Sequence, residues 1–204
     1  MHTTKLLKCA CQAAVLFAVL FVFISCNPLE NETQSASLLV VQSIAGKDVE
    51  GNEVNFLQSD VIFVDPLTGA RYCRADTAEA TLSASMLDPD PLLGPSQYND
   101  IQVTRYVVTY MRADGKNAQG TDVPYSFEGG LSVLVPIGQS VSVSFIIVRE
   151  VAKQEPPLLN LTQAFTGDVL NITARVDFYG HDLANKNVKA TGYLPIFFAN
   201  YADQ

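Results

Sequence analysis

Apolar and polar residues alternate with a period of two along several stretches of the chain. In the clearest stretch, residues 170–180, every second residue is apolar and those between are mostly polar or charged. Similar alternation runs through residues 78–86, 141–147 and 188–198. A period of two is typical of a β-strand with one buried face and one face in water. The pattern therefore predicts four strands that bury one side each in a hydrophobic core.

Shorter apolar stretches predict further strands. These stretches are residues 38–44, 61–64, 104–112 and 131–135, and in 104–112 the side chains expected in the core are Tyr106, Val108 and Tyr110. No stretch after residue 27 has a helical period. Residues 180–187 indicate a hairpin turn, and Pro195 marks its strand as an edge strand because proline has no N–H to donate. The prediction is an all-β fold, an antiparallel two-sheet sandwich of seven or eight strands with long loops.

Two parts of this pattern carry a family resemblance. Residues 106–110 as a central strand and residues 172–198 as a closing hairpin resemble an immunoglobulin-like or fibronectin type III-like domain. The chain has no Trp, so one hallmark of antibody domains is absent. A small β-barrel or a jelly roll would give a similar periodicity.

The first 25 residues have the features of an export signal. Lys5 and Lys8 give a basic start, and the uninterrupted apolar run 13–24 ends just before Ser25. Twelve residues in a helix rise about 18 Å, which is too short to span a bilayer. The segment therefore predicts a signal peptide that is removed after export.

Residues 23–26, Phe-Ile-Ser-Cys, resemble the lipobox of bacterial lipoproteins. The resemblance implies that Cys26 receives a diacylglyceryl group, that cleavage precedes it, and that its new amine is acylated. Phe23 departs from the usual Leu. Asn27 is not the Asp that marks inner-membrane retention in enteric bacteria, which favours the outer membrane. The alternative is an ordinary signal peptide cut near Ser25.

The resulting organisation has three parts. Residues 1–25 are the lipoprotein signal peptide, residues 26–36 the lipidated Cys and a tether, and residues 37–204 the β-sandwich domain. The segments RYVVTYMRADG and ARVDFYGHDLA also resemble parts of uncharacterised bacterial lipoproteins. We expect an exported protein held at the cell envelope by lipid on Cys26.

The number of cysteines and the net charge limit the bonds, metal sites and partners that the domain can have. After loss of the leader and lipidation of Cys26, Cys73 is the remaining thiol, so the domain has no disulfide and no Cys cluster for a metal. The net charge of −8 becomes −10 when Lys5 and Lys8 leave with the leader. An acidic protein repels phosphate backbones, so we expect no nucleic-acid partner.

Candidate catalytic groups are sparse. His181 is the one histidine after the leader, and it lies in an expected turn. The loop acids Asp88 with Asp90 and Asp100 with Asp122 could hydrolyse glycosides or bind Ca²⁺, but they match no motif, and solvated turn residues are the default interpretation. We therefore expect no enzyme activity, no cofactor and no metal site.

One strand face is unexpectedly aromatic. Tyr193, Phe197 and Tyr201 share the side of strand 188–198 that should face water, where they could contact a ligand or a partner, or be covered by other parts of the chain. Long loops at residues 87–100, 112–130 and 150–168 are either crossovers or further places for binding. The expected function is a structural or protein-binding envelope module. The alternative is a carbohydrate- or solute-binding module that uses the long loops or the aromatic face.

Overall fold

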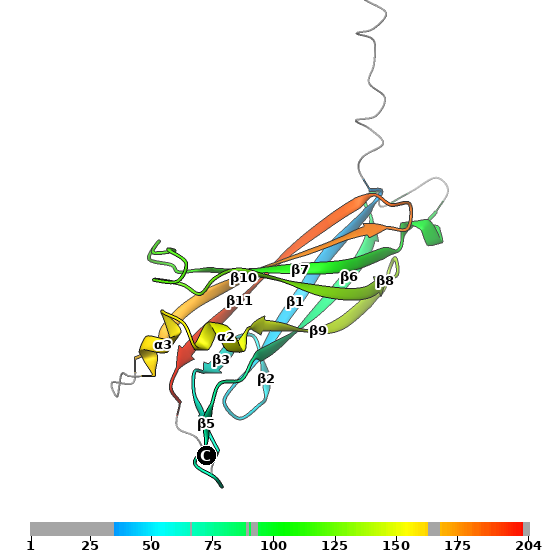
Figure 1. Ribbon diagram of the computed structural model, residues 1–204. Coiled ribbons are helices and arrows are strands. Elements are labelled where there is room, and N and C mark those ends of the chain that lie inside the picture. Colours follow the sequence, from blue (N-terminus) through cyan, green and yellow to red (C-terminus); the bar gives the residue numbers. More distant parts are fainter. Residues whose placement is uncertain (1–34, 66, 89, 91–93, 163–167, 202–204) are drawn as a thin grey trace, which may run out of the picture. The chain divides into compact units, whose positions relative to one another are not determined.

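The alternating segments form seven strands of nine residues or more (Figure 1). The computed structural model describes residues 35–65, 67–88, 90, 94–162 and 168–201. The long strands are β1 (Ser37–Lys47), β6 (Asp76–Met86), β7 (Ile101–Met111), β8 (Phe127–Val135), β9 (Ser140–Val148), β10 (Leu170–Asp182) and β11 (Asn187–Ala199). The short strands are β2 (Glu53–Val54), β3 (Leu57–Asp60), β4 (Phe63–Val64) and β5 (Arg71–Tyr72).

Two sheets make the sandwich. The four-stranded sheet has the order β2-β1-β6-β9, and the five-stranded sheet has the order β3-β11-β10-β7-β8. All these pairings are antiparallel except β3 with β11, which is parallel. A separate hairpin joins β4 to β5. The predicted two-sheet sandwich is confirmed, with seven long strands and short additions at its margins.

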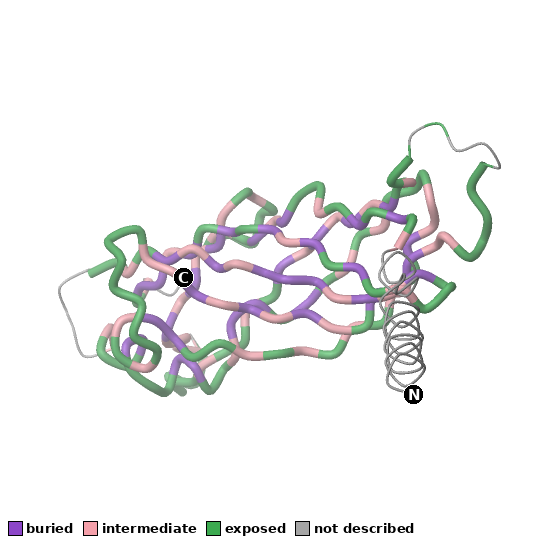
Figure 2. Tube along the Cα trace, turned by 90° about the horizontal axis from the view of Figure 1, so that it is seen from above, coloured by how far each residue is buried: buried purple, intermediate pink, exposed green. Residues whose placement is uncertain are grey.

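The core lies where the alternation placed it. Buried residues alternate with less buried ones along the strands in Figure 2, and every second side chain of β10 from Ile172 to Phe178 is buried. Tyr106, Val108 and Tyr110 of β7 are at most 4% exposed, as expected. Between the sheets, the ring of Phe145 packs edge-to-face against Tyr106 at 5.0 Å and against Phe178 at 5.4 Å. These contacts join the sheets into one core.

The structure differs from the sequence prediction in two details. Helices α2 (Glu150–Lys153) and α3 (Leu158–Leu161) and the 3₁₀ turn η1 (Gln97–Asn99) lie in segments expected to be loops. One turn of helix is too short to show a period. In β11, β3 covers the edge from Ile196 to Ala199, so only the part up to Pro195 is an outer edge.

The sandwich has two distinct ends. At the first, which we call the Ser35 end, Ser35 donates a hydrogen bond to Asp182 over 2.7 Å, and the Leu87 amide donates to the Ala36 carbonyl over 2.8 Å. The second, the Lys47 end, is where β1 finishes. Eleven residues of strand separate the two ends by about 33 Å. The predicted signal peptide and Cys26 lie outside the described residues.

Candidate functional site

A cavity of about 410 Å³ opens at the Lys47 end. Its volume falls in the range typical of small-molecule sites, roughly 300–1,000 Å³. Segments far apart in sequence form it: the end of β1 and the following turn, β3, β4, the start of β6, helix α2 and Tyr201. Its charged lining residues are three cations, Lys47, Arg74 and Lys153, and four acids, Asp48, Glu50, Asp60 and Asp76.

Lys153 forms the least exposed part of the lining. Its side chain is 1% exposed, and the ammonium nitrogen lies 2.9 Å from one carboxylate oxygen of Asp76 and 3.0 Å from the other. It also donates a hydrogen bond to the Asp60 carbonyl over 2.7 Å. The hydroxyl of Ser59 donates to Asp76 over 2.6 Å. The ammonium therefore has partners for its donors, and Asp76 remains 18% exposed at its side chain.

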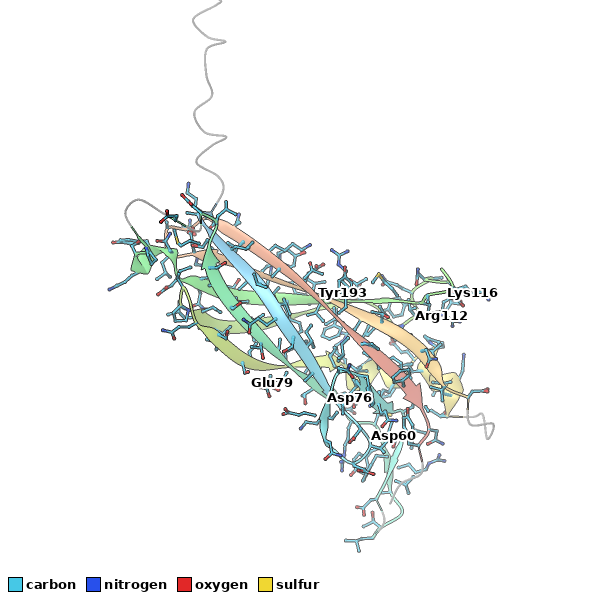
Figure 3. All side chains as sticks on the ribbon, turned by 180° about the vertical axis from the view of Figure 1, so that it is seen from behind. Asp60, Asp76, Glu79, Arg112, Lys116 and Tyr193 are labelled. Carbon is cyan, nitrogen blue, oxygen red and sulfur yellow. The ribbon has the colours of Figure 1, made fainter. Side chains whose placement is uncertain are left out.

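Short elements hold this pair in place. Asp76 is the first residue of β6 and pairs in register with Val148 at the end of β9. Helix α2 follows β9 directly, and it turns the chain so that Lys153 reaches back to Asp76. Ser59 and Asp60 belong to β3, which joins the edge of the other sheet. The ion pair thus connects both sheets at one end of the core, where Figure 3 labels Asp60 and Asp76.

The electrostatics of Asp76 reflect this burial. Desolvation raises the pKa of its carboxyl, and the nearby Lys153 ammonium and the Ser59 hydrogen bond oppose that rise. Removing an ion pair from water costs more than the pair regains unless the remaining hydrogen bonds are also made. Buried charged pairs beside a cavity are therefore candidates for a functional role as well as a structural one.

Aromatic groups and a guanidinium line the outer part of the cavity. The Arg74 guanidinium stacks on the Phe63 ring at 3.8 Å and contacts the Tyr72 hydroxyl. Opposite, the Tyr201 amide donates to the Asp60 carboxylate over 3.1 Å. Asp48 accepts hydrogen bonds from the amides of Glu50 and Asn52. The cavity therefore offers carboxylates, cationic donors and apolar ring faces within one space.

The three predicted aromatic residues occupy different settings. Tyr201 lines the cavity, and its hydroxyl donates to the Phe197 carbonyl over 3.2 Å. The Phe197 ring packs against Phe56 at 5.7 Å. Tyr193 is 56% exposed on the outer face of the five-stranded sheet, opposite Arg175 in register. In Figure 3 Tyr193 lies along the sheet, away from Asp60 and Asp76.

The face around Tyr193 carries its own charge network. Asp177 accepts a hydrogen bond from Thr191 over 2.5 Å and lies 3.2 Å from Arg175 and 3.3 Å from Lys189. Burial acts to raise the pKa of Asp177, but these hydrogen bonds and ion pairs together hold it below its usual value. The carboxylate of Asp177 is therefore paired with cations on the same sheet face.

The remaining candidates stay apart from the cavity. Asp88 and Asp90 are exposed, Asp100 accepts the Ile137 amide over 3.0 Å, and Asp122 accepts the Ala118 amide over 3.2 Å. In the described part of the chain, no three His, Cys, Asp or Glu residues gather as a metal site would require. Burial raises the pKa of the half-buried Cys73 thiol.

Sequence reasoning missed Lys153 and Asp76. Lys153 lies in the segment AKQEPP, where a single lysine before prolines resembles any solvated loop residue. Asp76 precedes the alternation that begins at Ala78 and so looks like a strand cap. Neither position carries a local signal, because 77 residues separate the partners.

Comparisons with known proteins add no assignment: no family model, no curated protein and no solved structure matches this chain. Among the described residues, no helix has both the length and the apolar character needed to cross a membrane.

Proposed function

We propose that this protein is an exported envelope lipoprotein, anchored through lipid on Cys26, whose sandwich domain binds a small polar solute of the carbohydrate class without chemical turnover. The cavity at the Lys47 end, with the buried pair Lys153–Asp76 in its lining, carries the proposal. A cavity at this end favours solute binding over a purely structural role, because a structural domain needs only a packed end. The outer membrane is the proposed location.

The lining chemistry suits a polyhydroxylated ligand. Carboxylates accept hydrogen bonds from hydroxyl groups, and the guanidinium of Arg74 donates them. Phe63 and Tyr201 supply apolar faces that match the C–H face of a sugar ring. The charged lining groups nearly balance, so a neutral or zwitterionic ligand would leave little uncompensated charge. The acidic chain as a whole favours a partner other than nucleic acid.

The anchor is tested by metabolic labelling of cells with palmitate. We expect label in the full chain and its loss in Cys26→Ser, together with release of that variant from the membrane fraction. An unlabelled chain that fractionates like Cys26→Ser would refute the anchor. Two or more acyl chains would make attachment effectively lasting, since each buried CH₂ contributes roughly 0.8 kcal/mol.

The cavity is tested by ligand-induced shifts of the melting temperature across a panel of mono- and oligosaccharides. Binding should be lost in Arg74→Ala and kept in Arg71→Ala, because Arg71 is an exposed neighbour that does not line the cavity. It should also be lost in Tyr201→Ala and kept in Tyr193→Ala. The reverse result for the two tyrosines would move the site to the face of the five-stranded sheet.

A second candidate is a protein-binding module. It is favoured by β8, which ends the five-stranded sheet; among the described strands, none pairs with its outer side from Phe127 to Val135. An unpaired strand can accept an added strand from a partner. A photo-crosslinker at Ser132, compared with one at Ser83 in the interior strand β6, would capture such a partner in cells. A saccharide panel without any shift, together with specific capture at Ser132, would favour this candidate. As part of this second proposal, we also propose that the domain is immunoglobulin-like.

A further inference from the structure

Both ends of the sandwich expose apolar side chains, and the ends differ in the number of charged residues beside them. At the Ser35 end, Tyr98 is 69%, Leu87 60%, and Leu38 and Leu183 44% exposed. Backbone hydrogen bonds hold these positions at one end: the Leu183 amide donates to the Asp100 carbonyl over 3.0 Å, and the Leu87 amide donates to Ala36. Ser37 also donates to the Asn99 carbonyl over 2.6 Å, which fixes η1 beside the start of β1.

The Lys47 end also exposes apolar side chains, such as Leu67 at 94% and Val49 at 57%, but it carries more charge. Among the described residues at the Ser35 end, the exposed charges are Asp88 and Asp90; Asp100 and Lys186 are half-buried, and Asp182 is 2% exposed. The segment 48–76 at the Lys47 end carries eight charged residues: Asp48, Glu50, Glu53, Asp60, Asp65, Arg71, Arg74 and Asp76. At the Ser35 end the exposed Leu and Tyr side chains thus have fewer charged neighbours than the apolar side chains at the Lys47 end.

We propose that the Ser35 end docks on the lipid bilayer, with Leu87, Tyr98 and Leu183 at the headgroup level, so that the cavity faces away from the membrane. This inference rests on the proposed anchor at Cys26. Only eight residues lie between Cys26 and Ser35, and the nine steps from one Cα to the next span at most about 32 Å when fully extended. Tyr is suited to this setting because its ring is apolar and its hydroxyl stays hydrated.

The geometry explains why one end, and not a sheet face, would meet the membrane. The chain enters the domain at the Ser35 end, about 33 Å from the Lys47 end. The exposed aspartates, Asp88 and Asp90, lie on the turn after β6, where they can stay in the headgroup layer beside zwitterionic lipids. The inference therefore predicts docking on bilayers of phosphatidylcholine and phosphatidylethanolamine, and weaker docking as anionic lipid is added.

The sequence has no Trp, so a single introduced Trp reports one position. The acylated full chain is reconstituted in phosphatidylcholine–phosphatidylethanolamine vesicles that contain lipid brominated near the headgroup, a contact quencher. Tyr98→Trp should lose about half of its fluorescence, because interfacial insertion reaches roughly 5–10 Å into the boundary layer. Tyr125→Trp is the matched control: it replaces an exposed tyrosine, 49% exposed, in the loop after β7 at the Lys47 end, and it should be unquenched.

A charge introduced at the Ser35 end tests the apolar contact itself. Leu183→Glu in the Tyr98→Trp background should reduce the quenching, and Leu67→Glu in the distant β4–β5 hairpin should leave it unchanged. Circular dichroism checks that both variants keep the fold.

Equal quenching at Tyr98→Trp and Tyr125→Trp would overturn the orientation. No quenching at either position, in a chain that stays on vesicles, would overturn docking while the anchor stands. A mass spectrum without acyl groups would overturn the anchor, and docking with it.

Discussion

Replacement of Lys153 by Met should strongly destabilise the domain. The substitution keeps the length and apolar stem of the side chain and removes its charge. Asp76 would keep the hydrogen bond from the Ser59 hydroxyl, 2.6 Å away, and the Asp60 carbonyl would lose the hydrogen bond from Lys153. Breaking a buried ion pair by removing one partner costs about 3–5 kcal/mol, a large part of the 5–15 kcal/mol typical of a domain.

Urea unfolding followed by circular dichroism measures this loss. With an m-value of about 2 kcal/mol/M, the midpoint of Lys153→Met should fall by roughly 1.5–2.5 M. Asp76→Asn in the same background removes the unpaired charge and should recover part of the loss. The double-mutant cycle should then give a coupling free energy of about 1–3 kcal/mol.

The pH dependence supplies a sharper check. Burial already raises the pKa of Asp76, and loss of the ammonium would raise it further. The pKa of this carboxyl is raised above 3.8 in the folded state. Below the unfolded pKa the group is neutral in both states and has no effect on stability. As pH rises through the folded pKa, the group becomes a buried charge and destabilises the fold. The deficit of Lys153→Met against the parent should therefore shrink between pH 7 and pH 4. Additive single substitutions, each costing under about 1 kcal/mol and independent of pH, would refute the reasoning.

Three other positions give independent tests. Despite its burial, Asp177 has a lowered pKa, so it stabilises the fold above pH 3.8, and this stabilisation is lost as pH falls through the folded pKa. Stability measured against pH should therefore fall less steeply at acid pH in Asp177→Asn than in the parent. Parallel curves would contradict this. Gly46→Ala would place Cβ 2.2 Å from the Phe56 carbonyl oxygen and should cost about 1–3 kcal/mol in thermal unfolding, whereas Gly130→Ala meets nothing within 4 Å and should not. Burial raises the pKa of the Cys73 thiol, so iodoacetamide should label it more slowly in the folded chain than in urea, and equal rates would contradict that.

Much of the fold could be predicted from local pattern. The alternation in β6, β9, β10 and β11 identified the strands and the side of each that meets the core. In β7 the expected core residues Tyr106, Val108 and Tyr110 are buried. The turn after β10 links two antiparallel strands as predicted. The helices α2 and α3 gave no signal, because a single turn contains too few residues to show a period.

The candidate site was far less predictable. The sequence drew attention to Tyr201 through its spacing from Tyr193 and Phe197, but that spacing suggested a shared face, and the structure divides the three among a cavity, a packed ring pair and an open sheet surface. Most charged residues of the cavity lie in or beside loops, where the sequence alone gives no reason to distinguish any one of them from an ordinary solvated residue. Their significance lies in their proximity.

What the sequence determined by itself is the set of strand faces, because the side-chain period of a strand is a local property that each segment carries alone. Only the tertiary structure decided that Asp76 and Lys153, 77 residues apart, would meet at the Lys47 end. That meeting depends on the order of strands in two sheets and on a one-turn helix after β9. Sheet order follows from how all the faces pack together, so no single segment encodes it.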